Sequence, residues 1–302
     1  MLRWIILWFC LTTTAFADRL IIEPEAGPQP IIAAIQQAHH TIHLVMYGFT
    51  HKPLLETLLS AQEHNRTVQI LLEKAPYESA SENKKTIEAF ERHHLSWQGS
   101  IPDIRLIHEK ALMIDGKEAI IMTFNFTHSA FNNQRNFALV VDDPSTVNNI
   151  EHIFSADWNH TPIHTATSVI LLSPDNSRSG ILQLIQQAKH TIKIYAQHLT
   201  DYETIGALAK AARKHKQVDI ITSLPLRSSA EEYLTRAGVH LHYIKKYMIH
   251  AKVIMIDDDT ALIGSTNLTR SSLDDNRELS VITTDKNIIQ QLNSTFHADL
   301  QE

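Results

Sequence analysis

The sequence predicts an α/β protein built from two tandem-repeated halves, each with a central mixed β-sheet flanked by helices, related by a pseudo-twofold axis. The first observation is a repeat, because the octapeptide at residues 35–42 returns at 185–192 with one substitution. The second is a His-x-Lys triplet that begins at His108 and again at His250. The third is an alternation of apolar, β-branched runs with helical patterns, which is typical of α/β folds.

Residues 1–17 have the pattern of a secretory signal peptide. Arg3 precedes a short apolar run at 4–11, and Ala15-Phe16-Ala17 is a small-residue cleavage site. The run is shorter than the roughly 20 residues of a transmembrane helix, although an uncleaved anchor is the alternative. We therefore expect cleavage after Ala17 and a secreted or periplasmic protein. The single cysteine, Cys10, would leave with this segment, so neither disulfides nor thiolate chemistry is expected.

The rest of the chain divides near Pro162 into two predicted repeats, residues 18–162 and 163–302. In the first repeat we expect strands at 41–49, 68–72 and 137–141, and helices at 31–40, 53–65, 84–93 and 145–159. In the second repeat we expect helices at 180–190, 203–215, 230–237 and 286–300. The offset between the repeats falls from 150 to 142, so the first repeat holds eight extra residues. We place them in the polar stretch 77–85, as a surface insertion or an extended helix start.

The mature chain is acidic. Removing residues 1–17 takes away Arg3 and leaves 26 Lys and Arg against 33 Asp and Glu, a net charge of −7 with neutral histidines. Proteins dedicated to nucleic acids usually carry a basic surface that neutralises phosphates. The charge argues against a dedicated nucleic-acid binder, while a local basic cleft stays compatible with it.

The strongest signal is a motif that occurs once in each repeat. His108 and Lys110 lie in the β-like run 106–114, and His250 and Lys252 in the run 249–256. In a strand, residues i and i+2 point to the same face, so each histidine projects together with its lysine.

An aspartate, Asp115 or Asp257, follows seven residues after each histidine, with turn-forming residues behind it. The two aspartates complete the motif and are counted with the catalytic set. Their place at a turn nevertheless favours a role in bracing the hairpin over contact with the substrate.

Two histidines and two lysines that converge at a seam suit the cleavage of a phosphodiester. Two ammonium groups can neutralise the non-bridging oxygens, a role that metal ions play elsewhere. One imidazole can attack phosphorus and the other can protonate the leaving oxygen, which splits the reaction into two steps. Such a site needs no metal ion and no other cofactor.

Further polar residues follow each motif at matching distances. Asn125 and Asn267 stand seventeen residues after the histidines, and their amides suit a phosphoryl oxygen. Each is preceded two residues earlier by a hydroxyl, Thr123 or Ser265. We expect these four residues to contact the substrate phosphate or to support the groups that do.

Asn136 and Glu278 stand twenty-eight residues after the histidines and are candidate partners of imidazole Nδ1. We expect each to accompany the histidine of its own repeat. A carboxylate beside His250 would favour the imidazolium that an acid needs, and an amide beside His108 the neutral ring that a nucleophile needs. This reasoning predicts His108 as the nucleophile, with His250 as the acid and then as the base for water.

At these residues the chain resembles the phospholipase D superfamily, whose defining motif is H-x-K-x4-D followed by G-S-x-N. The second copy carries every position, as His250, Lys252, Asp257, Gly264, Ser265 and Asn267. The first copy differs in having Met122-Thr123 for Gly-Ser. A single H-x-K is ordinary on a half-exposed strand, but two copies in register with their followers are not. The resemblance implies a phospholipase D-like fold, a covalent phosphohistidine, no metal, and a site at the seam between the halves.

The resemblance leaves the substrate open. We expect a secreted phosphodiesterase of the phospholipase D type that hydrolyses a phosphodiester, or transfers it to an alcohol, with phospholipid as the favoured substrate. A metal-independent endonuclease acting on DNA or RNA is the alternative, which the compact size favours and the acidic charge disfavours. A silent module that binds a phosphorylated ligand is the third reading, and two intact motifs argue against it.

Several residues near the motifs are candidates for contact with the substrate or with a membrane. The apolar segment Tyr247-Met248-Ile249 is the candidate for transient membrane contact. Basic residues that could line a cleft are Arg105, Arg135, Lys245, Lys246, Arg270 and Arg277. Arg135 and Arg277 recur in both repeats, which makes them the stronger candidates. Because one chain carries both motifs, a monomer is expected to hold the complete site.

Overall fold

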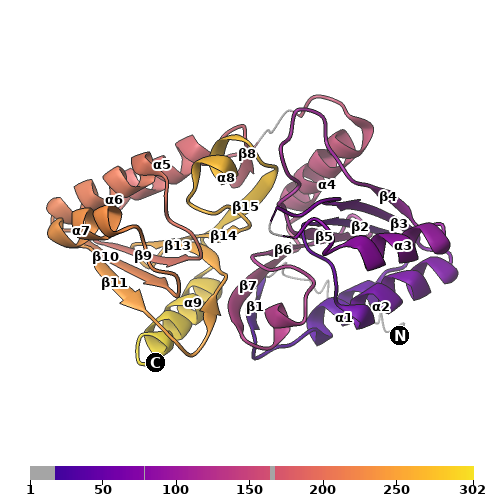
Figure 1. Ribbon diagram of the computed structural model, residues 1–302, viewed down its shortest axis with the longest axis horizontal. Coiled ribbons are helices and arrows are strands. Elements are labelled where there is room, and N and C mark those ends of the chain that lie inside the picture. Colours follow the sequence, from indigo (N-terminus) through magenta and orange to yellow (C-terminus); the bar gives the residue numbers. More distant parts are fainter. Residues whose placement is uncertain (1–17, 78, 164–166) are drawn as a thin grey trace, which may run out of the picture.

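The computed structural model describes residues 18–77, 79–163 and 167–302 of the 302-residue chain. The predicted signal peptide therefore lies outside the described residues. Two β-sheets, one from each repeat, form the two sides of the molecule in Figure 1. The structure confirms the predicted α/β fold with two tandem halves and mixed sheets. The predicted boundary at residues 162 and 163 falls between the last helix of the first half and the first strand of the second.

The two sheets have the same topology. The first runs in the order β1 (Arg19–Glu23), β7 (Gln134–Val141), β6 (Glu118–Met122), β5 (Ala111–Ile114), β2 (Thr41–Met46), β3 (Thr67–Leu72) and β4 (Ser96–Gln98). The second runs β8 (Ile170–Ser173), β15 (Glu278–Thr283), β14 (Thr260–Gly264), β13 (Lys252–Ile256), β9 (Thr191–Ala196), β10 (Gln217–Thr222) and β11 (His240–Tyr243). In each sheet the last three strands are parallel and the other neighbours antiparallel. The repeat in the sequence is thus a repeat of the whole sheet.

Helices cover the outer face of each sheet and fill the space between the sheets. The outer helices are α1 (Gln29–Gln37), α2 (Lys52–Glu63) and α3 (Lys84–Arg92) in the first half, and α5 (Ser177–Gln187), α6 (Tyr202–Arg213) and α7 (Ser228–Arg236) in the second. α4 (Pro144–Asn159) and α9 (Lys286–Asp299) contribute to one apolar core that includes residues of both sheets. Within the described residues, no helix combines the length and the apolar character needed to cross a bilayer.

The helices begin and end within a few residues of the predicted positions. α4 begins at Pro144 because the side chain of Asp143 accepts a hydrogen bond from the backbone N–H of Thr146, and proline suits the first helical turn. α9 begins in the same way behind Asp285. The short helix α8 (Arg270–Asp274) was not predicted, since five residues carry no periodic pattern.

The eight extra residues of the first half lie in two places. Eleven residues separate β3 from α3, against five between β10 and α7, so six of them lie there. The other two lie between β4 and His108. The larger insertion includes most of the predicted stretch 77–85, and it borders the seam.

Each half lends a short segment to the sheet of the other. β12 (Met248–Ile249), just before His250, pairs in parallel with the start of β7. Reciprocally, Ile107, just before His108, forms a parallel bridge with Arg277, the residue before β15. Because the two exchanges are equivalent under the repeat, each motif histidine is held at the edge of the opposite half.

The motif histidines do not lie inside continuous strands as predicted. His108 precedes β5, and His250 falls between β12 and β13. The chain leaves its own sheet at these points to reach the other half, so the ladder is interrupted at each histidine.

Candidate active site

A pocket of about 740 Å³ opens at the seam and is lined by residues of both halves. His108 and His250 both line it, as do Asn125 and Asn267. The structure therefore brings together four of the residues predicted from the two motifs. The exchanged segments explain the convergence, since each delivers one imidazole to the seam.

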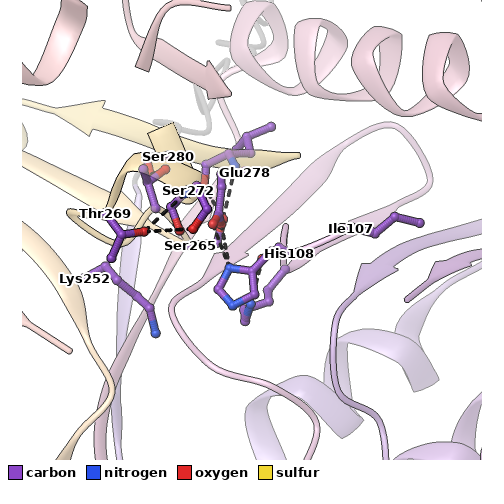
Figure 2. A network of polar contacts seen from close by, with 12 residues as sticks. Ile107, His108, Lys252, Ser265, Thr269, Ser272, Glu278 and Ser280 are labelled. Atoms are coloured by element: carbon purple, nitrogen blue, oxygen red, sulfur yellow. Dashed lines mark hydrogen bonds and ion pairs between the residues drawn. The ribbon is translucent and has the colours of Figure 1, made fainter. Parts of the chain in front are cut away.

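His108 is held by the second half. Its backbone N–H donates to the carbonyl oxygen of Arg277, 3.0 Å away. Its ring Nδ1 lies 2.8 Å from both carboxylate oxygens of Glu278, as Figure 2 shows, and Glu278 is fully buried. A carboxylate can only accept here, so Nδ1 carries the proton and the lone pair of Nε2 is left for chemistry.

His250 is held by the first half. Its ring Nδ1 lies 3.1 Å from the side-chain oxygen of Asn136 and 3.1 Å from Nζ of Lys252. The hydroxyl of Thr123 donates to the same oxygen of Asn136 across 2.9 Å. Thr123 thus supports the partner of His250 and is itself fully buried, away from the pocket.

The predicted pairing of histidines with their partners is therefore wrong. Glu278 contacts His108 instead of His250, and Asn136 contacts His250 instead of His108. The physical reason is the exchange of segments. The residue before His108 pairs with the residue before Glu278, and β12 pairs with the two residues before Asn136. His108 therefore contacts Glu278 in β15 of the second half, and His250 contacts Asn136 in β7 of the first half.

The two lysines lie beside the histidines and do not line the pocket. Nζ of Lys110 donates to the carbonyl oxygen of His108 at 2.6 Å, and Nζ of Lys252 donates to the carbonyl oxygens of Thr123, at 3.2 Å, and His250. Burial lowers the pKa of Lys110 to about 8 and holds the pKa of Lys252 well below its usual range. Both amino groups lie next to the pocket, and in their ammonium form they supply positive charge to it, although burial disfavours that form.

The same burial acts on the imidazoles. It lowers the pKa of His108 to about 4, although Glu278 opposes the shift, and Lys110 and Lys252 add to it. It lowers the pKa of His250 well below the usual range, again with both lysines adding to the effect. Both shifts favour the neutral rings, and a negative charge in the pocket would favour the imidazolium.

Asp115 and Asp257, counted with the catalytic set, lie elsewhere. Asp115 accepts hydrogen bonds from the backbone N–H groups of residues 39–41 at 2.7–2.9 Å, and Asp257 from those of residues 189–191 at 2.6–2.9 Å. Although burial opposes it, these donors lower the pKa of each carboxyl. Both aspartates have φ near +55°, in the left-handed region. They brace the hairpin turns, as their position predicted, and are not part of the pocket.

Ser265, Gly264 and Met122 are buried and do not line the pocket. The hydroxyl of Ser265 accepts from the backbone N–H of Leu279 at 3.1 Å and is buried between strands. A side chain at Gly264 would meet the carbonyl oxygen of Leu279 at 2.3 Å, so only glycine fits there. In the first half, Met122 is instead packed into the core, opposite Ala138.

Arg135 and Arg277, the stronger cleft candidates, are not cleft residues. Arg277 is buried, with its Nη2 2.9 Å from Oδ1 of Asp157 in α4. Arg135 is buried too, with its Nε 2.8 Å from Oδ2 of Asp299 in α9. Each arginine forms an ion pair with a helix of the other half. The two arginines recur because each side of the seam has an equivalent ion pair. Of the other basic candidates, only Arg105 lines the pocket.

Sequence reasoning missed several residues that line the pocket, namely Tyr47, Glu82, Gln197, His198 and Arg227. Tyr47 and Gln197 hold the same repeat position, directly after β2 and β9. The rings of Tyr47 and His108 pack in an edge-to-face arrangement, with centroids 4.7 Å apart. The carboxyl ends of strands are a usable signal, since ligands often bind there in α/β folds, but the predicted strand 41–49 runs past Tyr47 and no strand was predicted before Gln197. In the described ranges, no three or more His, Cys, Asp or Glu side chains are arranged to hold a metal ion.

Comparisons with known proteins find a family match in both halves of the chain. The sequence matches the family described as cardiolipin synthase, PLD-like domain, over residues 31–158 and again over 181–300. It is 26% identical to cardiolipin synthase B of Escherichia coli over 241 residues, which cover 66% of this chain and 57% of that protein. The chain spans about half to two thirds of the length of the curated relatives it matches.

Two solved structures share the fold across the chain. A polyphosphate kinase from Porphyromonas gingivalis superimposes with a TM-score of 0.77 at 16% identity, over 94% of this chain and 47% of that one. A phosphatidylserine synthase from Haemophilus influenzae superimposes with a TM-score of 0.69 at 13% identity, over 94% of this chain and 85% of that one. These likenesses establish the shared architecture of both halves.

Proposed function

Since the chain belongs to the phospholipase D-like family described as cardiolipin synthase, PLD-like domain, we propose that it cleaves a phospholipid phosphodiester through a covalent phosphohistidine. The observation that carries the proposal is the pair of imidazoles, His108 and His250, that line one pocket. Each is oriented at Nδ1 by a residue of the opposite half. That arrangement leaves two Nε2 atoms for a displacement at phosphorus.

In the first step, Nε2 of His108 attacks phosphorus. The nitrogen–phosphorus bond forms as the bond to the leaving oxygen breaks, and His250 gives that oxygen a proton. The phosphorylated ring of His108 carries a positive charge, which the buried carboxylate of Glu278 stabilises at 2.8 Å. His108 thus stays the proposed nucleophile, but for a different reason. The sequence suggested an amide beside it, whereas the structure places the carboxylate of Glu278 there.

His250 can serve as the acid only in the loaded site. Its ring is neutral in the empty pocket because burial and the two lysines disfavour the imidazolium. A bound phosphodiester brings a negative charge that offsets the lysines and favours protonation of Nε2. After the first step the neutral ring accepts a proton from water or from an alcohol, which attacks the phosphohistidine. Hydrolysis and transfer differ only in that acceptor.

Three observations favour phospholipid over nucleic acid as the substrate. The mature chain has a net charge of −7, which disfavours a polyanionic partner. The family and the E. coli relative carry the name of a phospholipid-synthesising enzyme. Tyr77 and Met248, which line the pocket, are 77% and 51% exposed and supply apolar surface for transient contact with a membrane.

Incubation with phosphatidylglycerol, phosphatidylcholine and plasmid DNA, each with EDTA, tests the proposal. We expect headgroup release from phospholipid at a rate within about two-fold of that without EDTA, because the lysines take the place of a metal. A His108→Ala variant serves as the inactive control. Cleavage of DNA alone would establish the endonuclease instead, and no turnover of any substrate would favour the silent binding module. Loss of all activity in EDTA would contradict the metal-free mechanism.

The protein is proposed to act as a monomer. Both imidazoles and both orienting residues come from one chain, so no second copy is needed to build the site.

The protein is also proposed to be exported. Residues 1–17 carry the export signal, and we expect N-terminal sequencing of the exported protein to begin at Asp18. A protein that keeps Met1 and stays in the cell would contradict this part alone.

A further inference from the structure

Nδ1 of His250 lies between a hydrogen-bond donor and a hydrogen-bond acceptor. Nζ of Lys252 and Oδ1 of Asn136 each lie 3.1 Å from it. A nitrogen of a neutral imidazole either carries a proton or offers a lone pair. With a lone pair, Nδ1 can accept from Lys252, and with a proton it can donate to Asn136. Both tautomers of the neutral ring therefore have a partner at Nδ1.

Nδ1 of His108 has no such choice. Its partners are the two carboxylate oxygens of Glu278, each 2.8 Å away, and both only accept. Nζ of Lys110 donates to the carbonyl oxygen of His108, and within the described residues it makes no hydrogen bond to the ring. The proton of His108 is thus fixed on Nδ1, whereas the proton of His250 can lie on either nitrogen.

The hydrogen bonds of Lys252 suit both its charged and its neutral form. An ammonium group has three N–H donors, and three acceptors meet them, namely Nδ1 of His250 and the carbonyl oxygens of Thr123 and His250. A neutral amine keeps two N–H donors for the two carbonyl oxygens and can turn its lone pair toward Nδ1. Lys252 can therefore give a proton to Nδ1 without leaving a buried donor unpaired.

The surroundings of Lys252 make it a better proton donor than an exposed lysine. Burial holds its pKa well below the usual range, and Lys110 adds to the shift, although Glu278 opposes it. Lys252 does not line the pocket, while His250 does. A proton from Lys252 consequently reaches the substrate only through the ring of His250.

We propose that Lys252 supplies a proton to Nδ1 of His250 while Nε2 of the same ring protonates the leaving oxygen. This relay rests on the proposed function, because it concerns the acid of that reaction. A bound phosphodiester favours the tautomer with the proton on Nε2, since that N–H faces its negative charge. The ring stays neutral before and after the step, so the burial that disfavours an imidazolium does not oppose it.

The relay balances over the two steps. The bond between phosphorus and the leaving oxygen breaks, and the electron pair on that oxygen takes the proton of Nε2. Nδ1 takes a proton from Nζ, which leaves Lys252 as a neutral amine, and Oδ1 of Asn136 then accepts from Nδ1. In the second step Nε2 takes a proton from water or an alcohol, and Nδ1 returns its proton to Lys252.

Two phospholipids that share the diacylglycerol arm, phosphatidyl-p-nitrophenol and phosphatidylethanol, test the relay in a Lys252→Arg variant. Arginine keeps the charge, but a guanidinium does not give up its proton. With the protein in excess, we expect release of ethanol to slow by about 10²- to 10⁴-fold, the range of general acid catalysis. Release of nitrophenolate should slow by less than about ten-fold, because that group leaves without an acid.

Lys110→Arg is the matched control, since it alters the other buried lysine in the same way and Lys110 does not contact the ring nitrogen. It should slow both lipids by the same factor. Equal losses for the two lipids in Lys252→Arg would overturn the relay and leave Lys252 with a purely electrostatic role. If the wild-type protein cleaves neither lipid, the proposed function falls and the relay with it.

A second variant decides the matter if Lys252→Arg does not fold. In Lys252→Ala, added methylammonium can occupy the space of the lost amino group and carries a proton to give. We expect it to restore the release of ethanol in proportion to its concentration. Tetramethylammonium carries the charge without an N–H and should restore nothing. Equal rescue by both cations, or rescue by neither, would overturn the relay.

Discussion

A single burst of nitrophenolate followed by slow turnover is the expected result when a His250→Asn variant is mixed with bis(p-nitrophenyl) phosphate. Nitrophenolate leaves without help from an acid, so His108 can still form the phosphohistidine. The variant lacks the base that activates water, and the intermediate accumulates at about one per active site. Rapid-quench measurement of nitrophenolate gives the burst amplitude, and mass spectrometry at neutral pH locates the phosphoryl group on His108.

His108→Asn is the matched variant, because the amide has a similar size and cannot form the intermediate. It should show no burst and a kcat lowered by about 10⁴- to 10⁶-fold, the range seen when a nucleophile is removed. A burst in His108→Asn, with the phosphoryl group on His250, would reverse the two roles. That outcome would mean that Glu278 orients the acid and Asn136 the nucleophile.

The free energy of unfolding should fall by about 3–5 kcal/mol in an Arg277→Met variant, because the change leaves a buried carboxylate without its partner. Asp157, on the other side of the seam, has its pKa raised by burial, although Arg277 opposes the shift. Without Arg277 that pKa rises further. The loss should therefore be smaller at about pH 5, where Asp157 can take up a proton, than at about pH 8. Urea unfolding at the two pH values measures both effects.

The double variant Arg277→Met with Asp157→Asn isolates the pair. We expect its loss to be smaller than the sum of the two single losses, since no uncompensated charge remains. Arg236→Met, which removes an exposed partner of Glu232, should change the stability by less than about 1 kcal/mol. A loss in Arg277→Met as small as that would show that the pair does not hold the halves together.

The fold and the two imidazoles were accessible from the sequence because they depend on long, repeated patterns. The octapeptide and the motif recur in register, and a repeat of the sequence became a repeat of the sheet. The pairing of imidazoles with their partners was not accessible. It depends on β12 and on the bridge at Ile107, segments of one or two residues with no periodicity of their own.

The prediction that Arg135 and Arg277 line the cleft was wrong because it relied on their recurrence in both halves. Arg135 and Arg277 appear in both halves, which suggested contact with the substrate, yet both are buried against helices across the seam. A duplicated chain repeats the residues that join its halves as faithfully as those that do chemistry. Glu82 was not predicted to line the pocket because it lies in an insertion that only the first half carries, so no repeat marks it.

The exchange of segments across the seam has a consequence for how such a site can become asymmetric. Two identical copies of the second half would place a glutamate beside both imidazoles, and two copies of the first half would place an asparagine beside both. A homodimer can change its two catalytic groups only together. Joining the copies in one chain removes that constraint, so each imidazole can acquire its own neighbour. The fused chain is what allows one imidazole to be specialised for bonding to phosphorus and the other for moving a proton.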